Sequence, residues 1–173
     1  MKDFLELAHD RYSVRKISSK PVEREKLEKI LEAGLIAPTA ANKQPFRIFL
    51  FTSPEAKEKL DQCHSFPFVK SAPAVFIVAG VQEEGWVRRW DGHNFTDVDA
   101  SIAATSMMFA IHDLGLGSTW CGAFDEGKVK ELFPELDGLT LIAMFPVGYI
   151  DEGAEPAPFH TVYRDRGEMF KEF

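Results

Sequence analysis

Cysteine is scarce in this chain, which has only Cys63 and Cys121 among its 173 residues. Two cysteines are too few for a zinc cluster, and their spacing is not that of a C-x-x-C pair. Such scarcity is typical of proteins in a reducing cytoplasm. Apolar runs of membrane-spanning length are lacking too, and acids stand near the N-terminus where a secretory signal needs an apolar stretch. We therefore expect a soluble, cytoplasmic protein that holds no metal and contacts no membrane.

A surplus of basic residues is also missing, because the formal net charge is −7. Nucleic acid is not an expected partner, since its phosphate backbone selects proteins with basic surfaces. Any site for a phosphate must then be a local cluster of basic residues on an acidic background.

Several catalytic signatures are absent as well. There is no P-loop and no His-Glu-x-x-His, and the five histidines are scattered. Residues 115–120 begin like a dinucleotide fingerprint, but Trp120 stands where the third glycine belongs, and the segment follows a predicted helix instead of a strand. Asp97 and Asp99 stand at a helix start, where acids more often serve the cap and the helix dipole than acid and base catalysis. We expect no side chain to act as the catalytic group.

Apolar residues, by contrast, are plentiful: 45% of the chain is hydrophobic and 15 residues are Phe. A chain of this length buries roughly 70% of the surface of its unfolded form. No linker or repeat interrupts it, so residues 1–173 are predicted to form a single domain. The aromatic surface also needs cover, which a subunit interface or a planar ligand could supply.

The spacing of apolar residues predicts an α+β protein. Helices are expected at 3–10, at 54–62, at 97–114 and from Asp125 to Phe133. One more helix is expected to run through Leu35 and to be stopped by Pro38. Strands are expected at 46–51, 74–79, 118–121 and 139–147. The strand at 46–51 should be buried on both faces, and the helix at 97–114 should be buried and central. The tail from Asp151 should be extended and end in a short helix.

The segment Arg11-Tyr12-Ser13-Val14-Arg15 contains the clearest candidate binding element. In an extended segment, residues two apart face the same way, so the two arginines and Ser13 should project together while Tyr12 and Val14 turn inward. Two guanidinium groups and a hydroxyl suit the oxygens of a phosphate dianion. A solvated basic turn is the simpler alternative.

A second segment, from Ala37 to Phe46, reads Ala-Pro-Thr-Ala-Ala-Asn-Lys-Gln-Pro-Phe and forms a polar loop between a helix and a strand. Together with the arginine element, the Gly-rich segment and a late basic pair, Arg164 and Arg166, it resembles the FMN-dependent nitroreductase family. The same four elements occur in that family in this order, and the resemblance spans nearly the whole chain. It implies an α+β fold in which helices flank a central, mainly antiparallel sheet, and a dimeric assembly.

The resemblance also implies FMN as the cofactor. The arginine element would hold its phosphate together with Arg164 or Arg166, and the polar loop would contact the flavin bound by the partner subunit. The backbone around Gly122 would approach the flavin ring and donate an N–H toward N5, which glycine permits because it lacks a Cβ. The implied cofactor-binding residues are Arg11, Tyr12, Ser13, Arg15, Pro38, Thr39, Asn42, Gln44, Cys121, Gly122, Arg164 and Arg166.

Two positions depart from the family pattern. Thr39 stands where serine is commoner, and the lysine that the family places near flavin O2 has Lys70 as its nearest match. Simpler interpretations stay open for three others. Asn42 and Gln44 could cap backbone groups within their loop, and Gly122 could serve a tight turn.

An irregular segment at 82–96 is expected to hold the substrate-facing part of the molecule. Trp86, Trp90 and Phe95 in this segment would form a lid over the flavin. The alternative is a surface helix whose aromatic residues pack on the domain.

The resemblance implies two-electron reduction of a small acceptor, such as a nitroaromatic or a quinone, by NADH or NADPH. Flavin N5 would be the reactive atom, and donor and acceptor would alternate in a ping-pong cycle. The expected assembly is a homodimer with the flavins in its interface. The alternatives are a flavin carrier or sensor without turnover, and a reductive dehalogenase-like or flavin-destructase-like enzyme on the same scaffold.

Overall fold

The computed structural model describes residues 3–173 and is built around a three-stranded antiparallel sheet. The strand order is β1-β2-β3, with β1 at Phe46–Phe51, β2 at Ala74–Gly80 and β3 at Thr140–Val147. Every residue of β2 is buried. An unbroken apolar run suits this central strand because helices cover both of its faces.

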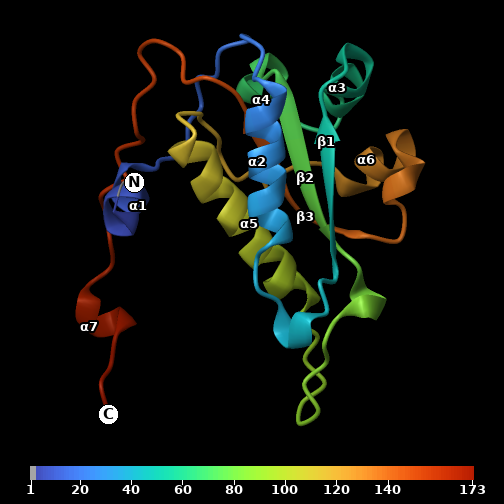
Figure 1. Ribbon diagram of the computed structural model, residues 1–173, viewed down its shortest axis with the longest axis vertical. Helices are drawn as coiled ribbons and strands as arrows, with labels where there is room; N and C mark the ends of the chain where they lie inside the picture. The colour runs from blue at the N-terminus through green and yellow to red at the C-terminus, as the bar shows by residue number, and fades with distance from the viewer. Residues whose placement is uncertain (1–2) are drawn as a thin grey trace.

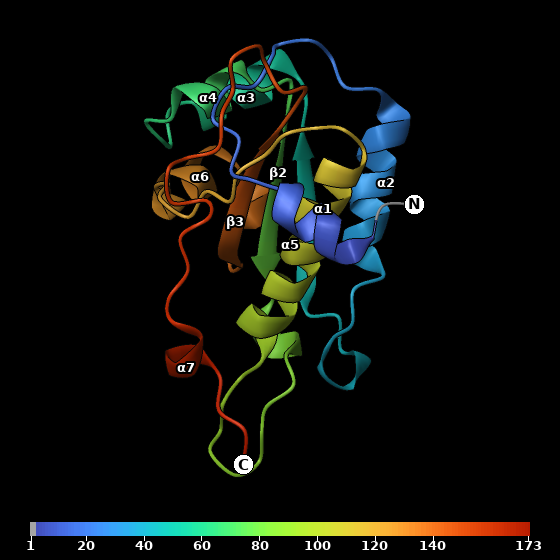
Figure 2. The ribbon, with the colours of Figure 1, turned by 90° about the vertical axis from the view of Figure 1, so that its left-hand side faces the viewer.

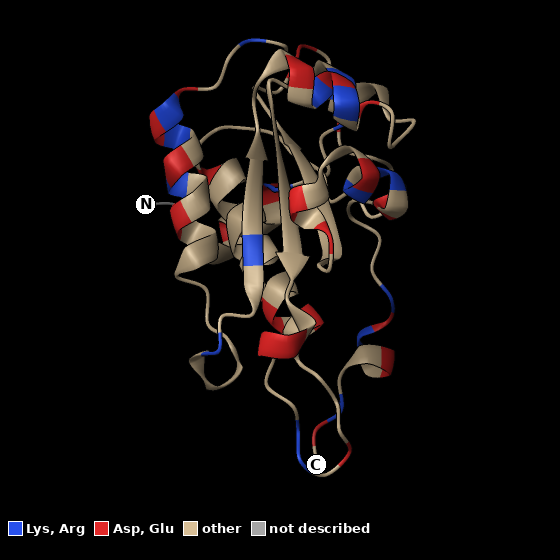
Figure 3. Ribbon diagram, turned by 90° about the vertical axis from the view of Figure 1, so that its right-hand side faces the viewer, with Lys and Arg blue, Asp and Glu red and all other residues tan. Residues whose placement is uncertain are grey.

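Helices lie on both sides of the sheet (Figure 1), and alternate residues of β2 enter two different cores. Phe76 and Val78 pack with α2 (Arg24–Leu35) and the long α5 (Thr96–Asp113). Val75 and Ile77 pack on the other side of the sheet, against the helices α3 (Pro54–Leu60), α4 (Pro67–Ser71) and α6 (Glu126–Leu132). The charged residues gather on the outer helices and loops and are sparse on the strands (Figure 3). The α+β fold with a central antiparallel sheet flanked by helices is therefore as predicted.

Local signals in the sequence place most of the helix ends. Ser53 accepts a hydrogen bond from the N–H of Ala56 at 3.1 Å, and Asp125 accepts one from Lys128 at 2.9 Å, as N-cap residues do. Gly115 follows α5 with φ at +73°, the left-handed conformation that glycine adopts without strain. The first helix, α1, spans Phe4–Asp10. None of the helices in residues 3–173 is both long and apolar enough to span a membrane.

Four expectations need correction. β1 is an edge strand with Arg47 exposed, so it is not buried on both faces. The segment at 118–121 makes only isolated bridges, since Cys121 alone pairs with β3. The helix α4 was not predicted because its five residues, begun by Pro67, are too short to show a helical period. Finally, α5 buries most of its circumference but leaves Val98 and Ile102 exposed.

The tail after β3 runs along one side of the molecule and ends beyond the last short helix, α7 (Arg166–Met169) (Figure 2). Its extended course and terminal helix are as expected. Apolar side chains along it are largely exposed, with Phe159 at 80% and Tyr163 at 71%. Other parts of residues 3–173 therefore do not bury these apolar side chains of the tail.

Candidate functional site

The segment 11–15 leaves α1 in an extended conformation and docks beside the residues that follow α5. Ser13 forms a parallel bridge with Ser118, and the N–H of Val14 donates to the carbonyl of Ser118 at 2.9 Å. Val14 is 1% exposed. A Cβ on Gly117 would lie 2.9 Å from Cγ1 of Val14, so only glycine allows the segment to approach this closely.

The side chains of this segment line a cavity of about 330 Å³. Arg11, Ser13 and Arg15 meet in it, and we call these three residues the cationic cradle. Tyr12 was expected to turn inward but also lines the cavity, because its hydroxyl donates to the carbonyl of Ala154 at 3.4 Å and the tail holds it there. The tail completes the wall with Ala157, Phe159 and His160.

The late basic residues do not line this cavity. Arg164 and Arg166 are exposed and lie further along the tail, at the start of α7. Lys70 lines a different cavity of about 250 Å³, together with Asp61 and His64. His160, which the sequence did not single out, is the tail's only ionisable side chain in the cradle cavity.

Cys121 lies within reach of the charge of Arg15, and Gly122 follows it in the chain. Cys121 exchanges two backbone hydrogen bonds with Met144 of β3, at 3.0 and 2.9 Å. Burial raises the pKa of its thiol to about 11, although the positive charge of Arg15 acts in the opposite direction. The thiol therefore stays protonated at neutral pH and is no nucleophile.

Gly122 is exposed, and within residues 3–173 its N–H has no hydrogen-bond partner. A Cβ built on it would find no atom within 4 Å, and its φ is not in the left-handed region. Neither packing nor backbone conformation within the described residues therefore requires glycine here. The open space over Gly122 leaves its N–H accessible to a ligand.

The polar loop at 39–44 is held in an unusual backbone conformation. Ala41, Asn42 and Gln44 have φ values of 50°, 54° and 49°, which residues with a Cβ seldom adopt. Thr39 accepts a hydrogen bond through Oγ1 from the N–H of Gln44 at 3.1 Å, and the amide of Gln44 donates to Oδ1 of Asn42 at 2.9 Å. These side chains therefore bond one another and the backbone within the loop.

Asp99 fixes this loop to α5. Its Oδ1 accepts a hydrogen bond from the N–H of Ala40 at 2.8 Å, and the carboxylate is 1% exposed. Asp97 accepts one from Nε2 of Gln82 at 2.7 Å. Neither acid caps the helix with its side chain, because Phe95 holds the N-cap position. The expected capping role is corrected to one of tethering, for which the sequence gives only a weak signal: an acid within an apolar helix.

The loop and the cradle lie at opposite ends of α5 (Figure 1). Ala40 contacts Asp99 near the first turn, whereas Ser118, which bridges to Ser13, follows the last turn. A helix of 18 residues is about 27 Å long. One chain therefore does not bring its two recognition segments together.

The expected lid is a hairpin, not a surface helix. Val87 bridges to Asn94, and the hairpin projects from the lower end of the molecule in Figure 1. Trp86 packs against Phe95 with ring centroids 5.1 Å apart, at the base of the hairpin. Trp90 is 75% exposed at its far end, where the guanidinium of Arg89 lies 4.3 Å from the centroid of its ring.

Comparison with known proteins gives consistent relatives. A protein of Methanothermobacter thermautotrophicus, whose name couples NADH dehydrogenase with NAD(P)H nitroreductase, is 31% identical over 85% of this chain and 77% of its own length. The crystal structure of a nitroreductase family protein from Clostridium difficile 630 has a TM-score of 0.89 and 34% identity, with 98% of each chain covered.

A nitroreductase of Desulfovibrio desulfuricans, solved in complex with FMN, has the same fold. Its TM-score is 0.79 at 23% identity, over the whole of this chain and 98% of the other. The sequence model of the Nitroreductase family matches residues 8–65 and 59–149, which together make up most of the chain. This protein belongs to the Nitroreductase family.

Proposed function

We propose that this protein is an FMN-dependent oxidoreductase that uses NADH or NADPH to reduce a small acceptor, such as a nitroaromatic or a quinone. One observation carries the proposal: two arginines line one cavity, and Gly122, which follows a cysteine within reach of the charge of Arg15, has an N–H without a partner in residues 3–173 and open space where a Cβ would be. The names of the relatives support the electron donor, and the FMN-bound Desulfovibrio neighbour supports the cofactor.

The residues present fit FMN. The cradle offers two permanent positive charges and a hydroxyl to a phosphate, and guanidinium groups bind such oxygens in pairs. The hydroxyl of Ser118, at the bridge to Ser13, is buried without a partner in the described chain and adds a further polar group nearby. The open side of Gly122 accepts a flat ring where any larger residue would hold it off.

When bound, FMN supplies hydride chemistry that no side chain of this protein can perform. Arg11, Ser13 and Arg15 bind the phosphate and so fix the position of the ring. The N–H of Gly122 would offer a fixed dipole to the ring, one that needs no reorganisation. The Cys121 thiol would add no negative charge to the site, because its raised pKa keeps it protonated. If the bound cofactor leaves a single face open, that face would hold one planar partner at a time, and donor and acceptor would alternate.

The functional unit is a homodimer. A two-fold axis that crosses the middle of α5 brings the 39–44 loop of one chain to the cradle of the other, because these segments lie at the two ends of the same helix. In that assembly the cradle of one chain would hold the phosphate, and the 39–44 loop of the partner would lie beside the same flavin. The hairpin at 86–95 lies at the same end of the molecule as the 39–44 loop. The same two-fold axis would place it over the partner's flavin as a lid.

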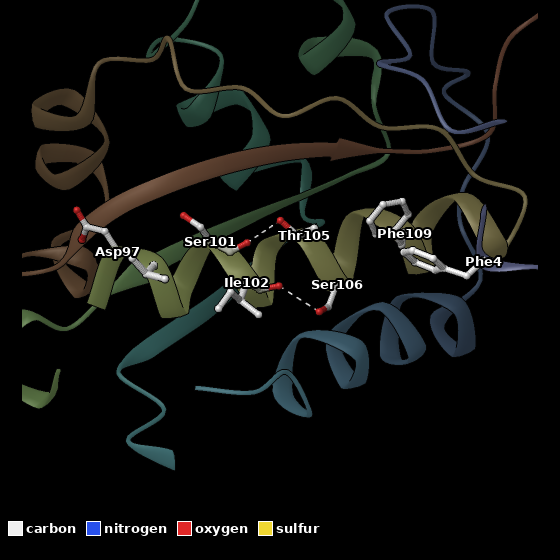
Figure 4. A pocket seen from close by; sticks show the side chains of 8 residues that line it. Phe4, Asp97, Ser101, Ile102, Thr105, Ser106 and Phe109 are labelled. Carbon is white, nitrogen blue, oxygen red and sulfur yellow. Dashed lines mark hydrogen bonds between the residues drawn. The ribbon is translucent and has the colours of Figure 1, made fainter. Parts of the chain in front are cut away.

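The surface of α5 has the chemistry of an interface (Figure 4). A shallow apolar groove of about 690 Å³ runs along it, and we call it the α5 groove. It is lined by Phe4, Asp97, Val98, Ser101, Ile102, Thr105, Ser106 and Phe109. The hydroxyls of Thr105 and Ser106 already donate to carbonyls of their own helix, at 2.8 and 3.1 Å. The groove can therefore be buried against a second copy of the chain without leaving these donors unpaired.

The reaction is tested with the purified protein under anaerobic conditions. The protein should be yellow, and NADH or NADPH alone should bleach it within seconds to minutes. Initial rates measured while nicotinamide and acceptor are varied should give parallel double-reciprocal lines. If the oxidised flavin stays yellow with both nicotinamides, the protein is not an NAD(P)H-driven reductase, and a flavin carrier becomes the better description.

A further inference from the structure

Asp99 is a buried acid in the first turn of α5 that the proposed reaction does not use. It is 1% exposed, and its neighbours Ala100 and Ala103 are fully buried. Its Oδ1 accepts the hydrogen bond from the N–H of Ala40, while Oδ2 is buried and has no hydrogen-bond partner in the described part of the chain. A buried carboxylate with an unpaired oxygen lowers stability. Core packing therefore does not account for an acid at this position.

The 39–44 loop depends on this acid for its hold on the rest of the molecule. Within residues 3–173, the bond from Ala40 to Asp99 is the only hydrogen bond that joins the loop to a part of the chain distant in sequence. The other hydrogen bonds of the loop run within it or to Phe46, at the start of β1. Three loop residues have φ between 49° and 54°, which costs free energy where a Cβ is present. Without the bond to Asp99, the loop should relax toward commoner conformations.

The position of Asp99 decides which flavin the loop can serve. Asp99 and the cradle of its own chain lie at opposite ends of α5 (Figure 1). In the proposed homodimer, the loop of one chain would lie beside the flavin held by the cradle of the other. A residue that fixes the loop would therefore act on the site of the other subunit.

We propose that Asp99 is a positioning residue for the flavin of the partner subunit. Its Oδ1 holds the 39–44 loop in the shape in which the loop meets that flavin, although Asp99 itself touches no cofactor. This inference rests on the proposed FMN function and its shared site.

The first test measures FMN affinity by flavin fluorescence in the flavin-free, full-length protein. Asp99→Ala removes the acceptor, and a loop that adopts its binding shape only about a tenth of the time should weaken FMN binding about tenfold. Asp99→Asn keeps an amide oxygen for the N–H of Ala40 and should bind FMN as the parent protein does. Asp113→Ala removes an exposed acid from the last turn of the same helix and should leave the affinity unchanged.

The second test asks which subunit Asp99 serves. A mixed dimer is purified from an Asp99→Ala chain and an Arg15→Ala chain that carry different tags. If Asp99 serves the partner's flavin, the intact cradle of the first chain meets the intact loop of the second, and the mixed dimer binds one FMN with the affinity of the parent protein. If Asp99 serves its own chain, neither site is intact and no FMN binds with that affinity.

Ala40→Pro breaks the same hydrogen bond from the loop side and takes the place of Asp99→Ala if that variant fails to fold. Proline has no N–H to donate. Thr39 before it is already extended, with φ −135° and ψ 156°, which is the conformation that a residue before proline prefers. Ala40→Pro should therefore lose FMN affinity to about the same degree as Asp99→Ala.

Four results overturn the inference. FMN affinity that stays at the parent value in Asp99→Ala, or in Ala40→Pro where it replaces that variant, removes Asp99 from the site and leaves the FMN function intact. An equal loss in Asp99→Asn and Asp99→Ala assigns the effect to the charge and not to the bond with the loop. A mixed dimer without a site of parent affinity shows that Asp99 acts within its own chain. Absence of FMN binding by the parent protein overturns both this inference and the proposed function.

Discussion

Two glycines near the cradle serve different purposes, and the structure separates them. Gly117 is required by packing, because a Cβ there would lie 2.9 Å from both Ile150 Cγ1 and Val14 Cγ1. Nothing in residues 3–173 requires glycine at position 122, since a Cβ there would meet no atom of this part of the chain within 4 Å. The first glycine therefore serves the fold, and the second leaves room for a ligand.

Alanine at the two positions should give opposite results. Gly117→Ala should destabilise the flavin-free protein by about 1–3 kcal/mol, because the side chains of Val14 and Ile150 must shift. Each kcal/mol lowers Tm by roughly 2–4 °C. Gly122→Ala should leave that Tm within about 2 °C but weaken FMN binding and slow its bleaching by NAD(P)H. Scanning calorimetry and flavin titration measure the two effects. Flavin behaviour in Gly122→Ala that matches the parent protein would show that the ring lies elsewhere.

Elements that depend on local signals can be predicted from the sequence, whereas features that depend on tertiary contacts cannot. The β2 run of apolar residues and the capping residues Ser53 and Asp125 are local signals, so they predict their elements correctly. The edge position of β1 cannot be read from its sequence, because burial of a strand depends on its neighbours in the sheet. Left-handed Ala41 and Asn42 are likewise imposed by tertiary contacts, among them the tether to Asp99.

The turn between α3 and α4 contains a buried histidine. The side chain of His64 is 2% exposed, and its Nδ1 accepts a hydrogen bond from the N–H of Phe66 at 3.1 Å. Burial lowers the pKa of His64, while Asp61, with Oδ1 3.7 Å from Nε2, opposes that shift. Protonation of Nδ1 would also break the bond to Phe66. The folded protein therefore favours the neutral ring.

This preference predicts a pH dependence of stability at the level of the turn. The unfolded chain takes up the proton at a higher pH than the folded chain, so the free energy of unfolding should fall as the pH drops below about 6.5. In His64→Asn, the amide oxygen replaces Nδ1 as acceptor but does not titrate. Urea unfolding between pH 7 and pH 5 should show a flatter profile for this variant. The exposed His93, changed to Asn, is the control and should leave the profile as it is.

At the scale of the whole molecule, the sequence identifies the recognition segments but not how they meet. The arginine element and the polar loop were both recognisable, yet nothing local reveals that α5 separates them by its full length. The sequence does not single out the tail residue His160 either, because its place in the cavity depends on the path of the tail. That residues 1–173 form a single domain stays a prediction, which one cooperative unfolding transition would support.

The shared site makes assembly and cofactor binding inseparable. If the α5 groove is the dimer interface, Ile102→Glu places an unpaired charge in it and should yield monomers. Obligate interfaces bury more than about 2,000 Å² and tolerate no unpaired charge at their centre. The monomers should also lose FMN, since each cradle then lacks the loop of its partner. Sedimentation velocity at low micromolar concentration, recorded at the flavin absorbance, measures both properties.

Gln62→Glu adds the same charge on the opposite side of the sheet, after α3, and should remain a yellow dimer. Two results would contradict the shared site. A parent protein that sediments as a monomer and keeps its flavin needs no partner loop. An Ile102→Glu variant that stays dimeric with FMN bound would show that the apolar surface of α5 faces something other than a second copy of the chain.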